Sequence, residues 1–206
     1  MNFKLIGTQY GGWALDTSLV PNNSTVISAG IGEDISFDLF LIKNKNCNII
    51  GVDPTMKSHA FIENQRGLKN FTLIKRALYS VDDDIITIYK NKIPNHVSES
   101  ILQSHKSAHK FDSYYAETIN LDSLFNSRDD ISVIKMDIEG SEYEVIESLS
   151  AVPDSVRQFC VEFHHFCTEK TMNDTNNAIS KLNGLGFKSF FEKPSDNKLS
   201  ELTFWR

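Results

Sequence analysis

Three side chains that could carry acid–base or metal chemistry lie at the ends of two apolar runs. Asp137 directly follows the run 131–136, and Glu162 and His164 lie at the end of the run 156–163. If both runs are parallel strands, these side chains meet at one edge of the sheet. His164 is the first choice for a general base, with Asp137 as a second catalytic residue. Asp137, Glu162 and His164 also offer ligands for a divalent ion such as Mg²⁺ or Mn²⁺.

Glu162 could instead pair with a charged residue of the neighbouring strand-like run 131–136. Lys135 lies inside an otherwise apolar strand and needs a partner for its buried charge. A pair between Glu162 and Lys135 across adjacent strands would supply that partner. Glu162 is therefore predicted either as a metal ligand or as the partner of Lys135.

The segment 91–112 is polar, is rich in serine and histidine, and separates two strand-like runs. Long loops inside a domain are commonly functional or mobile, so this one is a candidate substrate loop. His96 is a further catalytic candidate. His105 and His109 could join it in binding a polyhydroxylated ligand or in closing over that ligand. A solvated loop without a binding role is the alternative.

A glycine turn follows the first β-prone run. After residues 25–29, Gly30 and Gly32 allow a tight turn and the close approach of a ligand to the backbone. The next strand-like run ends at Asp53, whose carboxylate could accept both hydroxyls of a ribose. In a doubly wound sheet these positions are neighbours, which predicts a nucleoside cofactor. The alternative for Gly30 and Gly32 is an ordinary turn. The alternative for Asp53 is an acid at the start of a helix, before Pro54 at its first position.

The residues after the turn favour one class of cofactor. The third glycine of a dinucleotide fingerprint is absent, and Phe37 stands in the following helix. Asp34 and Asp38 add negative charge, which is unfavourable for a pyrophosphate. A ligand such as S-adenosylmethionine suits these acids better, because its sulfonium and amino groups are positive.

The most specific pattern surrounds Asp137. The sequence Lys-Met-Asp-Ile-Glu-Gly-Ser-Glu at 135–142 resembles the signature of the FkbM family of S-adenosylmethionine-dependent methyltransferases. Residues 28–38 and 53–55 resemble the cofactor motifs of one branch of that family. Further similarities lie at 10–13, 118–122 and 161–164, so the resemblance spans nearly the whole chain.

The resemblance implies a fold and a cofactor site. The fold would be α/β, a Rossmann-like class I methyltransferase fold with a mostly parallel seven-stranded sheet. By position, Asp53 would hold the ribose, Ala77 would border the adenine, and Asp137 would lie where cofactor and acceptor meet. Ser28 stands where the family often has an acid. The implied cofactor-binding set is Gly12, Ser28, Gly30, Gly32, Asp34, Asp53, Pro54, Thr55, Ala77 and Asp137.

The resemblance also implies the reaction, a methyl transfer to an oxygen of a sugar or natural product. We expect an O-methyltransferase that acts on a sugar or nucleotide sugar in surface polysaccharide biosynthesis. Methylation of a small natural product or of a nitrogen, and a non-catalytic cofactor-binding protein, are the alternatives. The missing third glycine and the acids at the turn oppose a reductase that uses a nicotinamide dinucleotide.

The order of strand-like and helix-like segments agrees with such a sheet. Strands at 25–29, 48–52 and 71–74 alternate with helices at 35–43 and 56–65, which predicts a parallel sheet with helices on its faces. Further strands are expected at 85–89, 114–119, 131–136 and 156–163, and further helices at 139–149 and 169–185. The runs 187–191 and 202–205 could form a closing C-terminal antiparallel hairpin.

Composition narrows the class of protein and its partners. The 206 residues are expected to form one domain, 1–206, with an N-terminal lead segment at 1–24. A formal net charge of −6 argues against a duplex nucleic-acid binder. Three cysteines without a CxxC pair favour a reducing cytoplasm. No signal peptide or membrane span is expected, the partner would be a small carbohydrate, and a homodimer stays open.

Overall fold

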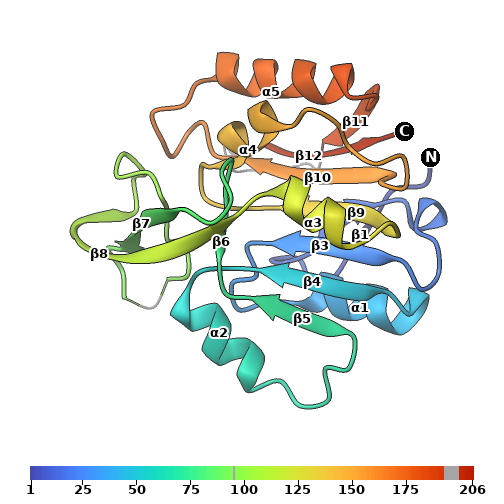
Figure 1. Ribbon diagram of the computed structural model, residues 1–206, viewed down its shortest axis with the longest axis horizontal. Coiled ribbons are helices and arrows are strands. Elements are labelled where there is room, and N and C mark those ends of the chain that lie inside the picture. Colours follow the sequence, from blue (N-terminus) through green and yellow to red (C-terminus); the bar gives the residue numbers. More distant parts are fainter. Residues whose placement is uncertain (95, 193–199) are drawn as a thin grey trace.

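A seven-stranded sheet organises the protein in a computed structural model that describes residues 1–94, 96–192 and 200–206 (Figure 1). The strand order is β11-β12-β10-β9-β3-β4-β5. Strands β5, β4, β3, β9 and β10 are parallel, and β12 and β11 are antiparallel additions beside β10. The bounds are β3 (Thr25–Ala29), β4 (Asn48–Val52), β5 (Phe71–Ile74), β9 (Ile131–Met136), β10 (Gln158–Phe163), β11 (Ser189–Glu192) and β12 (Ser200–Trp205).

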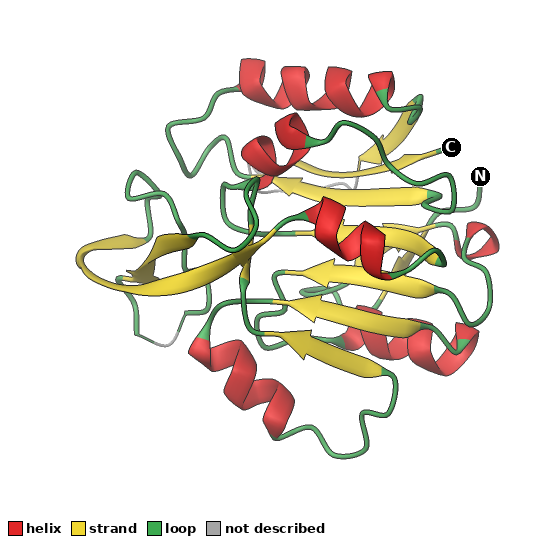
Figure 2. Ribbon diagram, in the orientation of Figure 1, coloured by secondary structure: helices red, strands yellow, loops and turns green. Residues whose placement is uncertain are grey.

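Helices flank this sheet (Figure 2). They are α1 (Ser36–Lys45), α2 (Met56–Glu63), α3 (Leu121–Ser127), α4 (Glu142–Ser148) and α5 (Met172–Gly184). Ile134 of β9 packs in a core with α3, α4 and α5, whereas its neighbour Val133 packs in a second core with α1. Successive side chains of a strand point to opposite faces, so a central strand covered on both faces is buried along its whole length and mostly apolar. This explains the unbroken burial of β9.

The N-terminal segment adds a small ribbon to the second core. Strands β1 (Lys4–Ile6) and β2 (Trp13–Leu15) pair antiparallel, and the short helix η1 (Thr17–Leu19) follows. Trp13 and Leu15 are buried. The side chain of Gln158 accepts a hydrogen bond from Asp16 N at 2.9 Å and donates one to Asp16 O at 3.0 Å. These paired bonds fix the N-terminal segment to the start of β10.

A second, three-stranded sheet is inserted after β5. It contains β6 (Ala77–Leu78), β7 (Ile85–Asn91) and β8 (Ala108–Ile119) in the order β6-β8-β7. The arrowheads of β3, β4, β5 and β10 point to the side where β7 and β8 project (Figure 1). The inserted sheet therefore stands at the carboxyl ends of the parallel strands, where ligands bind in open α/β sheets.

The structure confirms the predicted α/β fold, its parallel β-α-β-α-β first half and the C-terminal antiparallel hairpin. Some predicted boundaries were wrong. The polar segment 91–112 ends earlier, because β8 begins at Ala108; the segment before it, described except for residue 95, is called the loop 92–107 below. The helix expected at 139–149 begins at Glu142, because Glu139 and Gly140 have left-handed φ angles of 56° and 110°. Strands β1, β2 and β6 and helix α3 were not predicted.

The predicted single domain with a separate lead segment at 1–24 stays a prediction. Within the described residues, no helix is both long and apolar enough to cross a bilayer.

The turn after β3 generates a first test of the fold. Gly30 has φ +73°, and a Cβ added there would lie 1.6 Å from the carbonyl oxygen of Asp137. Gly67 has φ +80° with nothing within 4 Å of an added Cβ. Gly67→Ala should therefore lose only the left-handed strain, about 1–2 kcal/mol. Gly30→Ala should lose at least about 1–3 kcal/mol more because of overpacking. Urea unfolding measures both, and equal losses would contradict the close approach of β3 and β9.

Candidate active site

A cavity of about 670 Å³ opens at the carboxyl ends of the parallel strands. Its walls are the glycine turn after β3, residues 9–13, the loop 92–107, and the ends of β4, β9 and β10. This volume lies within the usual range for small-molecule sites, about 300–1,000 Å³. The inserted loop therefore closes one side of a pocket that the central sheet alone would leave open.

The glycine turn is held by the neighbouring strands. Gly30 N donates to Val52 O at 3.0 Å. Lys135 of β9 donates its amine to Ala29 O at 3.1 Å and also to Gly30 O, and it lies 5.6 Å from the ring centre of Trp13. Gly32 also has a left-handed φ of 55°, and an added Cβ would meet only a Val97 methyl at 3.6 Å. The turn is thus rigid where it touches protein and open toward the cavity.

These contacts correct one interpretation of Glu162. Among the described residues, the ammonium of Lys135 bonds to backbone carbonyls and makes no ion pair with Glu162. In the sheet register, Lys135 lies opposite Cys160 and Ser28. Lys135 thus satisfies its charge at the glycine turn, and Glu162 has to find a different partner.

Asp53 anchors both the glycine turn and the start of α2. One carboxylate oxygen accepts from Ile31 N at 2.7 Å, Gly32 N at 3.2 Å and Ser58 Oγ at 2.8 Å. The other accepts from Thr55 N at 2.7 Å and Thr55 Oγ1 at 2.6 Å. The carboxylate is buried and its acceptor sites are already filled by protein donors. Its predicted contact with a ribose stays a prediction that requires some of these bonds to be exchanged.

Asp34 holds the N-terminal segment over the cavity rim. Its carboxylate accepts from Ser36 N at 2.7 Å and Thr8 Oγ1 at 2.6 Å. Partial burial raises the pKa of Asp34, but the bonds from Ser36 and Thr8 outweigh it and leave the pKa below its usual value. Gly11 lies against Asp34, since an added Cβ would be 2.5 Å from its Cγ. The segment that carries Gly12 is thereby fixed beside the glycine turn.

The turn between β9 and α4 carries a concentration of acids. Asp137 ends the strand, and Glu139 follows with a left-handed φ of 56°. Glu142, in the first turn of α4, is fully buried. Its carboxylate reaches back to accept from Ile138 N at 2.9 Å and Gly140 N at 3.0 Å. Glu142 thus satisfies the backbone of the turn that presents Asp137 and Glu139 to the cavity.

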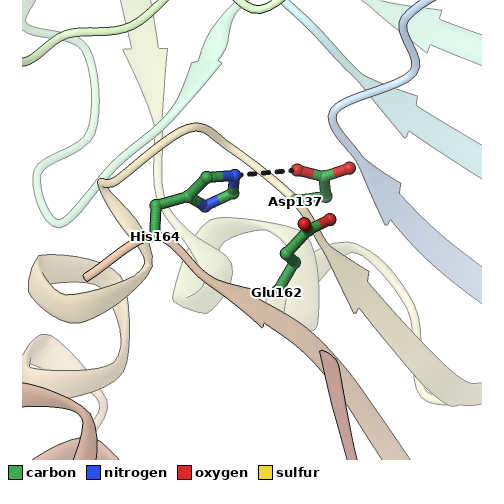
Figure 3. A group of neighbouring side chains, drawn as sticks. All are labelled: Asp137, Glu162 and His164. Atoms are coloured by element: carbon green, nitrogen blue, oxygen red, sulfur yellow. Dashed lines mark ion pairs between the residues drawn. The ribbon is translucent and has the colours of Figure 1, made fainter. Parts of the chain in front are cut away.

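His164 directly follows β10, and its imidazole points toward Asp137 (Figure 3). Its Nδ1 lies 2.9 Å from Glu142 Oε1. Its Nε2 lies 3.7 Å from Asp137 Oδ1 and 3.4 Å from Glu139 Oε2. One ligand atom from each of Asp137, Glu162 and His164 can be chosen so that all lie within 4.8 Å of one another. The sequence prediction that these three meet at the strand ends agrees with this geometry.

Burial and the charges of this cluster shift the pKa values of its members. Burial, with repulsion from neighbouring acids and opposed by Lys135 and His164, raises the pKa of Asp137 to about 6. Burial and Asp137 raise the pKa of Glu162 to about 9. Burial alone would lower the pKa of His164, but Glu142, Glu139 and Asp137 raise it well above its usual value. In this arrangement His164 holds a proton and cannot accept one, so its predicted role as a base requires a change in its surroundings.

The loop 92–107 brings its own histidines to the cavity. His105 is buried, with Nδ1 2.6 Å from Ser107 Oγ and Nε2 3.2 Å from Glu139 Oε2. Ser100 Oγ donates to Glu139 O at 2.6 Å, which fastens the loop to the acidic turn. His96 lines the cavity, whereas His109 is exposed on β8. The contact between His105 and Glu139 was beyond sequence reasoning, because no local spacing relates a loop residue to that turn.

A family model described as the methyltransferase FkbM domain matches residues 16–189. The chain belongs to this family. It is an S-adenosylmethionine-dependent methyltransferase. A comparison with curated proteins gives no match.

Several solved structures resemble this FkbM methyltransferase at low identity. A precorrin-6y C5,15-methyltransferase from Geobacter metallireducens is 12% identical, with 91% of this chain and 82% of that chain covered and a TM-score of 0.46. TrmK from M. capricolum, in complex with S-adenosylhomocysteine, is 10% identical, with 93% and 68% covered and a TM-score of 0.44. A TehB-like methyltransferase from Corynebacterium glutamicum is 9% identical, with 92% and 83% covered and a TM-score of 0.45. At these identities and TM-scores, the similarity says nothing about the acceptor that this chain methylates.

The cavity of the FkbM methyltransferase fits its cofactor. Gly30 and Gly32 line the cavity without a side chain, so a ligand can approach the backbone of the turn. Glu33, Asp34 and Asp137 line the cavity and suit the positive sulfonium and amino groups. The predicted cofactor residues on the cavity wall are Gly12, Gly30, Gly32, Asp34, Asp53, Pro54, Thr55, Ala77 and Asp137.

Ser28 differs from the rest of that predicted set. It is buried within β3, opposite Gly51 and Lys135 in register, and is not part of the cavity wall. A direct contact between Ser28 and the cofactor therefore has no support in this geometry.

The bonds of Asp53 generate a prediction for the FkbM methyltransferase. Asp53→Ala should leave buried donors unpaired and lose about 1–3 kcal/mol of stability. Because the glycine turn loses its anchor, the affinity for S-adenosylhomocysteine should fall at least about tenfold. Calorimetric titration and urea unfolding measure the two effects.

Asp130→Ala is the matched control. Asp130 binds Thr25 Oγ1 at the opposite end of β3, at 3.0 Å, away from the cavity. That variant should lose stability while retaining its affinity for S-adenosylhomocysteine. Wild-type affinity in Asp53→Ala would remove Asp53 from the cofactor site.

Proposed function

We propose that this methyltransferase methylates a hydroxyl oxygen of a sugar or nucleotide sugar, in the biosynthesis of a surface polysaccharide. The observation that carries the proposal is the convergence of Asp137, Glu162 and His164 at the cavity, beside the glycine turn. A sugar hydroxyl is a weak nucleophile, so it needs a general base or a divalent ion such as Mg²⁺ or Mn²⁺. These residues are suited to supply either.

The acidic cluster favours an oxygen acceptor over a nitrogen acceptor. Carboxylates stabilise the protonated form of an amine, and a protonated amine has no lone pair to attack a methyl group. Asp137 and Glu162 would therefore slow an amine acceptor. A neutral hydroxyl gains from the same groups, because they accept its hydrogen bond.

The remaining cavity wall suits a molecule with many hydroxyls. Asn91, His96, Ser98, Glu99 and Ser107 line it from the inserted sheet and its loop. Their side chains offer both hydrogen-bond donors and acceptors, as recognition of a sugar requires. We propose no nucleic-acid acceptor, because the wall is acidic and the chain carries a net charge of −6.

The cofactor supplies a methyl group activated on a sulfonium. The residues of the chain hold the reacting partners in line and exclude water, which accounts for much of the rate of such a displacement. Asp137 borders both partners, and the loop with His96 and Ser107 covers the acceptor. The free cysteines Cys47, Cys160 and Cys167 favour the cytoplasm as the place of reaction.

Two assays test this function. Calorimetric titration with S-adenosylhomocysteine and, separately, with NAD should give binding of the first alone. Transfer from methyl-labelled S-adenosylmethionine to a panel of nucleotide sugars, free sugars and amines should label a sugar, with an O-methyl signal in the product NMR spectrum. Labelling of the amines alone would overturn the proposal.

His96 generates a specific prediction. His96→Ala should raise KM for the sugar about fivefold, since one lost hydrogen bond is worth about 1 kcal/mol. The affinity for S-adenosylhomocysteine should stay unchanged, because His96 is proposed to contact the sugar and not the cofactor.

His109→Ala is the control, since His109 is exposed on β8 and does not line the cavity. Its KM should equal that of the wild type. Equal KM values in both variants would remove His96 from the acceptor site.

A further inference from the structure

The side chains of Asp137, Glu162 and His164 approach one another as ligands of a metal ion do (Figure 3). Their nearest ligand atoms all lie within 4.8 Å of one another, and Asp137 Oδ1 lies 3.7 Å from His164 Nε2. With metal–ligand bonds of about 2.1 Å, adjacent ligand atoms of an octahedron are about 3.0 Å apart and opposite ones about 4.2 Å. Small side-chain rotations would therefore bring the set to coordination distance.

A second observation concerns Nδ1 of His164, the ring nitrogen that faces Glu142 and not Asp137. Glu142 is fully buried, and its carboxylate is oriented by bonds from Ile138 N and Gly140 N. A carboxylate accepts hydrogen bonds and cannot donate them, so His164 Nδ1, 2.9 Å from Glu142, is the donor. A neutral His164 ring would therefore carry its proton on Nδ1. A metal-binding histidine typically donates its other ring nitrogen to a carboxylate in this way. A metal ion that displaced the second proton of the ring would meet the lone pair of Nε2, which lies 3.7 Å from Asp137 Oδ1 and 3.4 Å from Glu139 Oε2.

An ion pair alone does not account for the cluster. Nε2 of His164 makes no hydrogen bond among the described residues, and its contacts with Asp137 and Glu139 are 3.7 and 3.4 Å long. Lys135 is engaged by backbone carbonyls. His105 Nε2 lies 3.2 Å from Glu139 Oε2, and Lys135 and His164 both act electrostatically on Asp137. Glu162 makes no ion pair of its own among the described residues, and a carboxylate partly removed from water requires such compensation.

We infer that Asp137, Glu162 and His164 bind a divalent cation, with Glu142 as the positioning residue of His164. Two carboxylates and one imidazole suit Mn²⁺, and also Mg²⁺, better than a thiolate-preferring ion. Three protein ligands leave coordination positions open on the cavity side. One part of this inference rests on the proposed function. In that part, two neighbouring hydroxyls of the sugar would occupy the open coordination positions. Coordination would lower the pKa of the hydroxyl that is methylated.

Binding of Mn²⁺ alone tests the site. Free Mn²⁺ has a strong electron paramagnetic resonance signal that is lost on binding, so a titration of the full-length protein without cofactor or acceptor gives stoichiometry and Kd. We expect one Mn²⁺ per chain. Asp137→Asn and Glu162→Gln should each raise Kd at least tenfold. Glu142→Gln should raise it about 10- to 100-fold, the usual effect of removing a carboxylate behind a ligand histidine.

Glu63→Gln is the matched control, because Glu63 is an exposed carboxylate paired with Lys75 on α2. Its Kd for Mn²⁺ should equal that of the wild type. Thermal unfolding reports whether each variant folds. Absence of bound Mn²⁺ in the wild type, or the same Kd in Glu162→Gln as in the wild type, would overturn the inference.

A spectroscopic signature tests the imidazole separately. Electron spin-echo modulation of bound Mn²⁺ should show coupling to an imidazole nitrogen in the wild type and none in His164→Gln. If His164→Gln does not fold, the wild-type modulation and the Glu162→Gln titration still decide. Bound Mn²⁺ without nitrogen coupling would remove His164 from the site.

Failure of this inference can be told apart from failure of the proposed function. Methylation of a sugar that continues in EDTA, with no Mn²⁺ bound, would overturn the cation site alone. Bound Mn²⁺ with no sugar methylated would overturn the acceptor class and leave the cation site standing.

Discussion

The repulsion among four neighbouring carboxylates at one edge of the sheet constrains the structure around them. Glu142 is fully buried, and Asp137, Glu139 and Glu162 lie partly buried beside it. The fold compensates each differently: backbone N–H groups and His164 engage Glu142, and His105 faces Glu139. Asp137, Glu139 and Glu162 all line the cavity. The site is therefore prepared for a positively charged partner.

Contacts of β9 link the glycine turn to the acidic cluster. Lys135 lies in the strand that ends at Asp137, and its ammonium holds the carbonyls of the glycine turn. The carbonyl of Asp137 in turn occupies the space that a side chain at Gly30 would need. A change in β9 would therefore alter the contacts that hold the glycine turn. The loop 92–107 is joined to the same region, because Ser100 Oγ donates to Glu139 O.

Much of the fold and part of the site could be predicted from sequence. The apolar runs of β3, β4 and β9 and the glycines after β3 are local signals, and they gave the right strands and the right edge. The reach of Glu142 back to the turn and to His164 is a tertiary contact that no spacing encodes. The pairing of Lys135 with Glu162 was wrong, because nearby backbone carbonyls satisfied the ammonium. Ser28 was assigned by resemblance alone, and its burial in β3 removes it from the cavity wall.

We propose that the ends of β9 and β10 form the acceptor side of the methyl-transfer site and that the glycine turn forms its cofactor side. A crystal structure of the complex with S-adenosylhomocysteine would decide this. We expect the thioether sulfur to lie between Gly30 and Asp137, with Glu162 and His164 on the side that the methyl group would face. A sulfur atom directed away from Asp137, or a ligand bound outside the cavity, would contradict it.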